Sequence, residues 1–308
     1  PCNPSIGGPA KGIVVREVDA LGGVMPRVAD LTALQFKMLN TTKGPGVWSM
    51  RVQSDKNAYS LMMQDLCMHT ENLTLYEDIV EEVLAEDKKI TGVRLQKNGI
   101  LESNVVVLTT GTYMDSCRMV SATVTPGGPD NEPTTKNLSE SLRKLGIKLF
   151  RLKTGTPARV LTSSIDFSKT SLEEGSKRFI RFSEDTKEDE VRSVAEQMPC
   201  YLTYTTEKTK EIVLANLNKS SMYSGVVKGV GPRYCPSFED KIVRFSDKER
   251  HQLFLEPLDA TNELTYVQGF STSMPYDVQE EMVHSVIGLE NCEIVKYAYA
   301  IEYDAIDP

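Results

Sequence analysis

Apolar residues recur at helical spacing in several stretches of this chain. After the glycine-rich stretch 5–12, apolar positions at intervals of three and four predict a helix over 13–21. Ser54 or Asp55 is expected to cap a second helix, and Gly146 to close a third. The second and third helices are predicted at 54–68 and 138–145, and the same spacing predicts two further helices at 207–217 and 276–286.

Other stretches are typical of strands and turns. Extended segments are predicted at 73–80, 82–86, 90–95, 105–109, 201–205 and 292–296, with a strand pair flanking 242–256. Asn98-Gly99 lies between apolar flanks and predicts a hairpin. The run Val105–Leu108 is apolar without alternation, which is typical of a strand buried on both faces of a parallel sheet. This run ends at 109–112, and ligand crevices form at the carboxyl ends of strands in such sheets. Residues 120–135 are expected to be a loop.

Composition narrows the class of protein. At about 150 residues per domain, 308 residues predict roughly two domains. Forty-three acidic residues against 35 Lys and Arg give a net charge of −8, and 25% of residues are charged, which excludes a disordered or collagen-like chain. The longest aliphatic run is far shorter than the roughly 20 residues of a membrane-spanning helix, so no membrane segment is predicted. Because the first residue is not Met and no closing helix ends the chain, a fragment is expected.

Charge is unevenly distributed along the chain. Between Lys136 and Arg159 seven basic residues face the single acid Glu140, a local balance of +6. Residues 166–196 hold nine acids and six bases. We therefore expect a domain junction near residue 150, and the basic segment is the candidate for contact with RNA phosphates.

Two of the six cysteines have unusual neighbours. No C-x-x-C pair occurs, so neither a disulfide framework nor a redox pair is predicted, and a reducing cytosol is expected. Cys2 precedes Asn3-Pro4 and a glycine-rich helix start, whose backbone N–H groups would favour a thiolate. Cys235 lies in a proline-bracketed loop two residues from Arg233. Both are candidate reactive thiols, with a small buried side chain as the alternative for each.

Several common site motifs are missing. The sequence has no G-x-G-x-x-G phosphate loop and no G-x-S-x-G nucleophile turn. His69, His251 and His284 have no Cys or carboxylate partner at metal-ligand spacing, so no metal site is predicted.

Nine blocks of sequence resemble one family and occur in its order. They are CNPSIGG (2–8), KG (11–12), EVDALGG (17–23), KGP (43–45), LKTGTP (152–157), GPRYCPSFEDK (231–241), FLEP (254–257), STS (271–273) and YAIEYD (299–304). They closely resemble the GidA family, also called MnmG, flavoproteins that modify the wobble uridine of tRNA. That family begins with a G-x-G-x-x-G turn for the FAD pyrophosphate and ends with a helical domain. Neither is present here, so the resemblance implies a central fragment.

The resemblance implies a fold and a domain order. It implies an α/β fold, in which a glutathione-reductase-like FAD-binding domain of Rossmann type is interrupted by an inserted α+β domain. Residues 1–150 would be a partial FAD-binding domain with a β-hairpin insertion. Residues 151–270 would be the inserted domain, associated with NAD and possible tRNA contact, and 271–308 the truncated return to the FAD-binding domain.

The resemblance also implies an activity. The family adds an aminomethyl or carboxymethylaminomethyl group at C5 of the uridine, using FAD, NADH and methylenetetrahydrofolate. It works in the cytoplasm as a homodimer with an MnmE-type GTPase partner. Two alternatives remain open: a non-catalytic fragment that binds tRNA or a partner, and a generic flavin-dependent NADH oxidoreductase.

Site residues follow from the same resemblance. Val80 would contact the adenine side of FAD and Thr135 another part of it, with Asn3 also at the cofactor. The NAD segment would be Gly231, Pro232, Arg233, Tyr234, Cys235, Pro236, Ser237, Phe238, Glu239, Asp240, Lys241, Ile242, Val243, Arg244 and Phe245. Cys235 or Cys2 would be the nucleophile, because a thiolate that adds to C6 makes C5 of uracil enolate-like. Asp240 or Glu239 would carry a proton.

Overall fold

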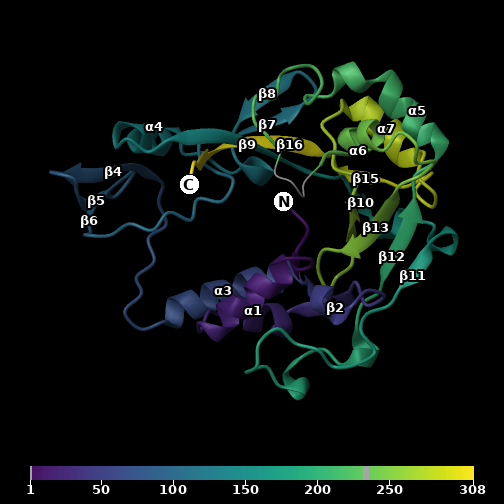
Figure 1. The fold of residues 1–308 in the computed structure, drawn as a ribbon, viewed down its shortest axis with the longest axis horizontal. Coiled ribbons are helices and arrows are strands. Elements are labelled where there is room, and N and C mark those ends of the chain that lie inside the picture. The colour runs from purple at the N-terminus through teal and green to yellow at the C-terminus, as the bar shows by residue number, and fades with distance from the viewer. Residues whose placement is uncertain (1, 232–235) are drawn as a thin grey trace.

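The computed structural model describes residues 2–231 and 236–308 of the chain. These residues form four antiparallel sheets that are joined by helices and long connections (Figure 1). Short 3-10 helices lie in the connections, at Pro45–Val47, Pro129–Asn131, Thr162–Ser164, Phe167–Lys169, Glu188–Glu190, Val194–Glu196 and Leu217–Lys219. The mixed α/β content agrees with the fold class expected from the sequence.

The N-terminal part is a three-stranded sheet with helices beside it. Its strands lie in the order β1 (Ser5–Gly7), β3 (Ser49–Ser54) and β2 (Ala33–Leu39), and its helices are α1 (Lys11–Ala20), α2 (Met25–Leu31) and α3 (Lys56–His69). The two helices predicted here are confirmed. Asp55 is the cap of α3, since its Oδ1 accepts from the backbone N–H groups of Asn57 and Ala58 at 2.9 Å each. Phe182, from a distant loop, completes the core of this part.

A second sheet is a meander packed against a helix. It consists of β4 (Val80–Glu86), β5 (Lys89–Leu95) and β6 (Gly99–Glu102), with α4 (Lys136–Lys144) against β4. Leu95 pairs with Gly99, which confirms the hairpin predicted from Asn98-Gly99. The predicted helix 138–145 is also confirmed, and Gly146 follows it with a φ of +83°.

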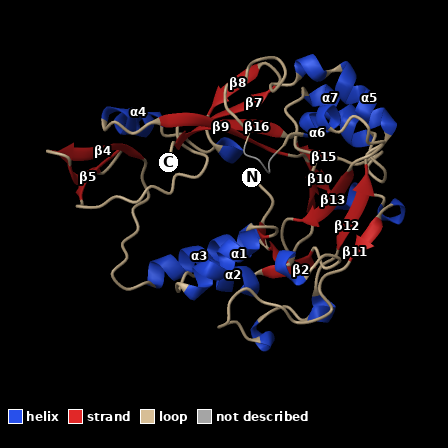
Figure 2. Ribbon diagram, viewed as in Figure 1, coloured by secondary structure: helices blue, strands red, loops and turns tan. Residues whose placement is uncertain are grey.

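The largest sheet has six strands and three helices. Its strand order is β11 (Ser171–Glu173), β12 (Cys200–Tyr204), β13 (Gln252–Pro257), β14 (Leu264–Gln268), β10 (Arg159–Leu161) and β15 (Ile294–Lys296). Figure 2 shows α5 (Glu207–Ala215), α6 (Phe238–Arg244) and α7 (Tyr276–His284) gathered beside it. The predicted strands at 201–205 and 292–296 and both predicted helices are confirmed. The strand expected before 242 is instead α6, whose N-terminus is capped by Ser237.

The fourth sheet connects the middle of the chain to its end. Its order is β8 (Thr123–Pro126), β7 (Cys117–Val120), β16 (Tyr299–Ile306) and β9 (Leu149–Thr156). β9 pairs with β16 over its whole length, and the expected junction near residue 150 falls inside it. The prediction of a loop over 120–135 is wrong for β8, because pairing with β7 supplies its backbone hydrogen bonds.

The predicted strand at 105–109 is absent from the described structure. The segment 105–109 has no strand assignment, and Val105 and Val107 are 72% and 80% exposed. Val106 and Leu108 pack on the core between α4 and the β4–β6 sheet. Within the described ranges no strand pairs with this segment, so only one of its two faces is covered and the prediction of a strand buried on both faces is wrong. The expected strand at 73–80 is likewise a connection up to Val80.

Candidate functional site

The first residues of the chain are fixed to two sheets by Asn3. Its Oδ1 accepts from Gln53 Nε2 at 2.8 Å, and its Nδ2 donates to Glu256 and, at 3.3 Å, to Gln268 Oε1. Cys2 is exposed and lies near Tyr266. Burial raises the pKa of Tyr266, and the charge of the nearby Cys2 adds to this effect. The thiol predicted to be reactive therefore occupies a defined position at the surface.

A buried ion pair lies next to Asn3. Arg51 Nη1 and Nη2 donate to the two carboxylate oxygens of Glu256 at 2.6 and 2.8 Å. The Glu256 side chain is 1% exposed and that of Arg51 is 19% exposed. This bidentate contact joins β3 of the N-terminal sheet to β13 of the six-stranded sheet, and no motif in the sequence predicts it.

A cavity of about 630 Å³ opens between the same two sheets. Charged groups on its wall are Lys11 and two ion pairs, Lys37 with Glu173 and Arg51 with Glu256. Its apolar wall includes Leu202 and Phe254. A cavity with both cations and an aromatic wall suits a planar, polar organic molecule.

Backbone and thiol groups also line this cavity. Gly8 has a φ of +89°, a conformation that favours glycine, and lies beside the start of α1. Its backbone is buried, and its N–H donates to the Met50 carbonyl at 2.8 Å. Cys200 lies in the same wall, and burial raises its pKa to about 12. That thiol is therefore protonated at neutral pH and is no nucleophile.

Val80 and Thr135, the two residues that the resemblance assigns to FAD, are in direct contact. Thr135 Oγ1 donates to the Val80 carbonyl at 2.8 Å, although 55 positions separate the residues in sequence. They lie at the start of β4 and at the N-terminus of α4. Val80 packs on the same apolar cluster as Val106 and Leu108. The structure thus brings this pair together beside the exposed apolar segment.

The segment assigned to NAD is described only in part. Pro232, Arg233, Tyr234 and Cys235 lie outside the described residues. Ser237 and Asp240 form a capping box at α6: Ser237 Oγ accepts from the Asp240 N–H, and Asp240 Oδ2 accepts from the Ser237 N–H, both at 3.2 Å. Asp240 Oδ1 also accepts from Tyr223 Oη at 3.2 Å. Asp240 therefore stabilises the start of the helix, and its predicted proton-carrying role stays a prediction.

Three other side chains of this segment face the interior. Phe238 and Ile242 belong to the core of the six-stranded part. Glu239 is fully buried, and its Oε1 accepts from Ser220 Oγ at 2.9 Å and Thr272 Oγ1 at 2.8 Å. Its Oε2 has no hydrogen-bond partner in the described part of the chain. These side chains contribute to packing and to a buried polar network.

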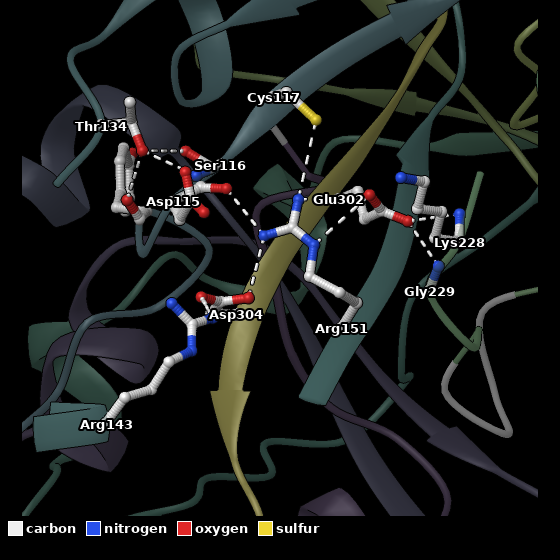
Figure 3. A network of polar contacts seen from close by, with 11 residues as sticks. Asp115, Ser116, Cys117, Thr134, Arg143, Arg151, Lys228, Gly229, Glu302 and Asp304 are labelled. Carbon is white, nitrogen blue, oxygen red and sulfur yellow. Dashed lines mark hydrogen bonds and ion pairs between the residues drawn. The ribbon is translucent and has the colours of Figure 1, made fainter. Parts of the chain in front are cut away.

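A second network centres on Arg151 (Figure 3). Its guanidinium donates to Glu302 at 3.2 Å, to Asp304 at 3.0 Å and to the Asp115 carbonyl at 2.7 Å. Glu302 Oε1 also accepts the backbone N–H of Lys228 at 2.7 Å and that of Gly229. The network therefore anchors the chain just before Gly231. Alternating acids in the 299–304 block were its only signal in the sequence.

Part of the basic segment, the sequence-predicted candidate for RNA contact, is paired with acidic side chains, whereas Lys136, Lys144 and Lys148 are exposed. Arg143 pairs with Asp304 at 2.6 Å, and Arg159 pairs with Asp130 at 3.2 Å. Lys153 is 2% exposed. With Arg151 also paired, much of the local positive charge is offset by acids that are distant in sequence, because the fold places carboxylates of β16 and the 130 region beside it.

Residues 2–231 and 236–308 contain neither a metal-ligand cluster nor a membrane-spanning helix. There, no group of three or more His, Cys, Asp or Glu side chains is placed to hold a metal ion. No helix in the same ranges is long and apolar enough to cross a membrane.

Comparison with known proteins gives matches over the whole chain. The family model for glucose inhibited division protein A matches residues 1–308. The tRNA uridine 5-carboxymethylaminomethyl modification enzyme MnmG of Mycoplasma mobile is 54% identical over 308 residues, and that of Ureaplasma parvum is 52% identical. Each alignment covers 100% of this chain and 50% of the relative. The chain therefore spans about half the length of the curated relatives it matches.

A solved structure agrees with these matches. The form I crystal structure of Aquifex aeolicus GidA superposes with a TM-score of 0.92 at 45% sequence identity. The match covers 99% of this chain and 51% of that one.

Proposed function

The chain belongs to the glucose inhibited division protein A (GidA) family, and we propose that it is the central part of an FAD-dependent enzyme that modifies the wobble uridine of tRNA. The observation that carries this proposal is the match over all 308 residues to relatives named for that modification. The proposal is stated for the full-length protein that contains this chain, which would act in the cytoplasm on tRNA.

The proposed reaction adds an aminomethyl or carboxymethylaminomethyl group at C5 of uridine. Methylenetetrahydrofolate would supply the carbon, NADH the reducing equivalents, and an MnmE-type GTPase would be the partner of a homodimer. C5 of uracil is a weak nucleophile. A cysteine thiolate that forms a bond to C6 moves electron density onto C5, and the same S–C6 bond breaks when C5 later loses its proton.

Cys2 is the described candidate for that thiolate. Its exposure and the three hydrogen bonds of Asn3 beside it support the role, since a nucleophile must be both accessible and held in place. The cavity between the N-terminal and six-stranded sheets is the proposed substrate site, because Gln268 and Glu256 both line it and hold Asn3. Cys235 is proposed from the resemblance alone.

The residues present fit one part of FAD. The contact between Val80 and Thr135 joins an apolar surface to a carbonyl and a hydroxyl, a donor set that suits the adenine side of the nucleotide. FAD would supply electron transfer when bound. Its pyrophosphate would need a phosphate loop, which these 308 residues lack. The NAD role of 231–245 and the domain limits 1–150, 151–270 and 271–308 remain proposals.

The test is made in the full-length protein. One of the two variants, Cys2→Ser or Cys235→Ser, is expected to abolish uridine modification while flavin content and folding stay unchanged, as judged by nucleoside analysis of tRNA from a complemented strain. Cys67→Ser is the matched control, since Cys67 lies on α3 away from the cavity lining. Normal modification by both Cys2→Ser and Cys235→Ser would reject the thiolate mechanism.

A further inference from the structure

A separate pocket lies where the β7–β8 hairpin meets the starts of α7 and β16. Its volume is about 360 Å³, and none of its lining residues belongs to the larger cavity. Three tyrosines line it: Tyr276, Tyr297 and Tyr299. A pocket near the lower end of the roughly 300–1,000 Å³ range of small-molecule sites suits a single nucleotide better than a whole dinucleotide cofactor.

The aromatic wall is held in place from α7. The rings of Tyr276 and Tyr297 lie with centroids 4.6 Å apart and planes tilted by 45°. The next residue, Ala298, donates its N–H to Gln279 Oε1 at 2.8 Å and accepts from Gln279 Nε2 at 3.0 Å. The Tyr297 hydroxyl donates to Glu280. Because these contacts fix the backbone and the ring, little further ordering is needed when a flat ligand stacks here.

The cation in this pocket is Arg118, one nitrogen of which has no partner among the described residues. Arg118 extends from β7 and lines the pocket, half-buried. Its Nε is buried and has no hydrogen-bond partner within residues 2–231 and 236–308. Arg143, Arg151 and Arg159, by contrast, all pair with carboxylates. A buried donor without an acceptor is unfavourable, and a guanidinium is suited to phosphate oxygens, so an anionic ligand fits this position.

We propose that this pocket binds one nucleotide of a single-stranded RNA segment. The base stacks on the tyrosine wall, and its phosphate meets Arg118. Ser121 and Thr123 at the rim provide hydroxyls for the sugar and phosphate. The inference rests on the proposed function and deepens it: the pocket is a second contact for the anticodon loop, separate from the site of the reacting uridine.

Binding of RNA to the full-length protein tests this proposal. The probe is a fluorescently labelled anticodon stem–loop, compared with a duplex of the same stem, and affinity is read by anisotropy over a range of salt. Tyr297→Leu is expected to weaken stem–loop binding by roughly 5- to 150-fold, as for loss of one base–aromatic stack, and to leave duplex binding nearly unchanged. Arg118→Gln is expected to weaken binding and to lower the salt slope by about 0.7.

Two control variants separate this role from a structural one. Tyr297→Phe keeps the ring and loses only the hydroxyl bond to Glu280, so it should bind as the wild type does. Arg94→Gln removes an equal charge from an exposed ion pair in the meander sheet and reports the non-specific effect. Variants are compared only where the melting temperature equals that of the wild type, and Tyr276→Leu serves in place of Tyr297→Leu if the latter does not fold.

Several results would overturn the inference. The inference would be wrong if the tyrosine and Arg118 variants bound the stem–loop no more weakly than Arg94→Gln does. It would also be wrong if these variants weakened binding of the stem–loop and of the duplex equally. Competition by a proline-rich peptide, without salt dependence, would assign the pocket to a protein partner. Because the assay needs no turnover, uridine modification by a Cys2→Ser, Cys235→Ser double variant would reject the proposed mechanism and leave this inference untouched.

Discussion

Replacing Arg51 with Met should loosen the junction between the N-terminal sheet and the six-stranded sheet. Glu256 is 1% exposed, and its carboxylate receives both Arg51 hydrogen bonds. Without Arg51, that buried charge would keep only Asn3 as a described side-chain donor. The loss of stability should be local to β1, β3 and β13, because these strands carry the Arg51–Glu256 pair or lie next to it.

The magnitude follows from burial. Removing one partner of a buried ion pair costs about 3–5 kcal/mol, because the remaining charge stays desolvated. The Arg51 side chain is 19% exposed, so part of its charge is already solvated and the lower end of that range applies. A loss of about 3 kcal/mol corresponds to a roughly 140-fold increase in the equilibrium constant for local opening, at about 1.4 kcal/mol per factor of ten.

Hydrogen–deuterium exchange of peptides that cover β1 and β13 measures this opening in the full-length protein. Arg94→Met is the matched control, because the Arg94–Glu82 pair is exposed and should contribute less than about 1 kcal/mol. The double variant with Arg51→Met and Glu256→Leu should recover much of the protection, since no buried charge remains. If Arg51→Met exchanged no faster than Arg94→Met, the argument from buried charge would be refuted.

Three further predictions separate packing, anchoring and protonation. Phe238→Ala should destabilise the protein by about 3–5 kcal/mol in thermal unfolding, because the Phe238 side chain is fully buried. Phe245→Ala should cost less than about 1 kcal/mol, because the Phe245 side chain is half-exposed. Equal losses of stability in the two variants would contradict this. Glu302→Gln should speed amide exchange in peptides covering residues 225–231, because Glu302 accepts backbone hydrogen bonds there. Glu290→Gln is the control and should not speed it, because Glu290 belongs to an exposed ion pair. Equal exchange rates in the two variants would disprove the anchoring role of Glu302. Burial and nearby lysines lower the pKa of His251 from its ordinary 6.5, so the stability of the folded protein should fall as pH drops below about 6.5. In denaturant titrations, His251→Phe should lose this pH dependence. An unchanged pH dependence would exclude His251 as its source.

Local signals in the sequence predicted most of the helices and turns correctly. Asp55 caps α3, Asn98-Gly99 forms a hairpin, and Gly146 follows α4 in the left-handed conformation. Each of these features depends on residues within a few positions of one another. Hydrogen bonds and backbone preferences at that range are fixed by the sequence itself.

Strands were predicted less reliably because a strand needs a partner. The run Val105–Leu108 has the composition of a buried strand, yet it lies unpaired and half uncovered in the described structure. The sequence predicts a loop at Thr123–Pro126, but these residues form a strand because β7 lies beside them. Composition indicates which faces of a segment can be buried. Whether they are buried depends on which other segments of the chain pack beside it.

The candidate site divides in the same way. The resemblance to the family indicated Asn3, Val80 and Thr135, but not that Thr135 contacts Val80 or that Asn3 contacts Glu256. The partners of Arg51 and Arg151 are 205 and 151 positions away, and no spacing rule reaches so far. Residues close in sequence determined helices and turns, whereas the packing of the sheets decided which charges meet, because electrostatic and hydrogen-bond energies depend on distance in space and not along the chain.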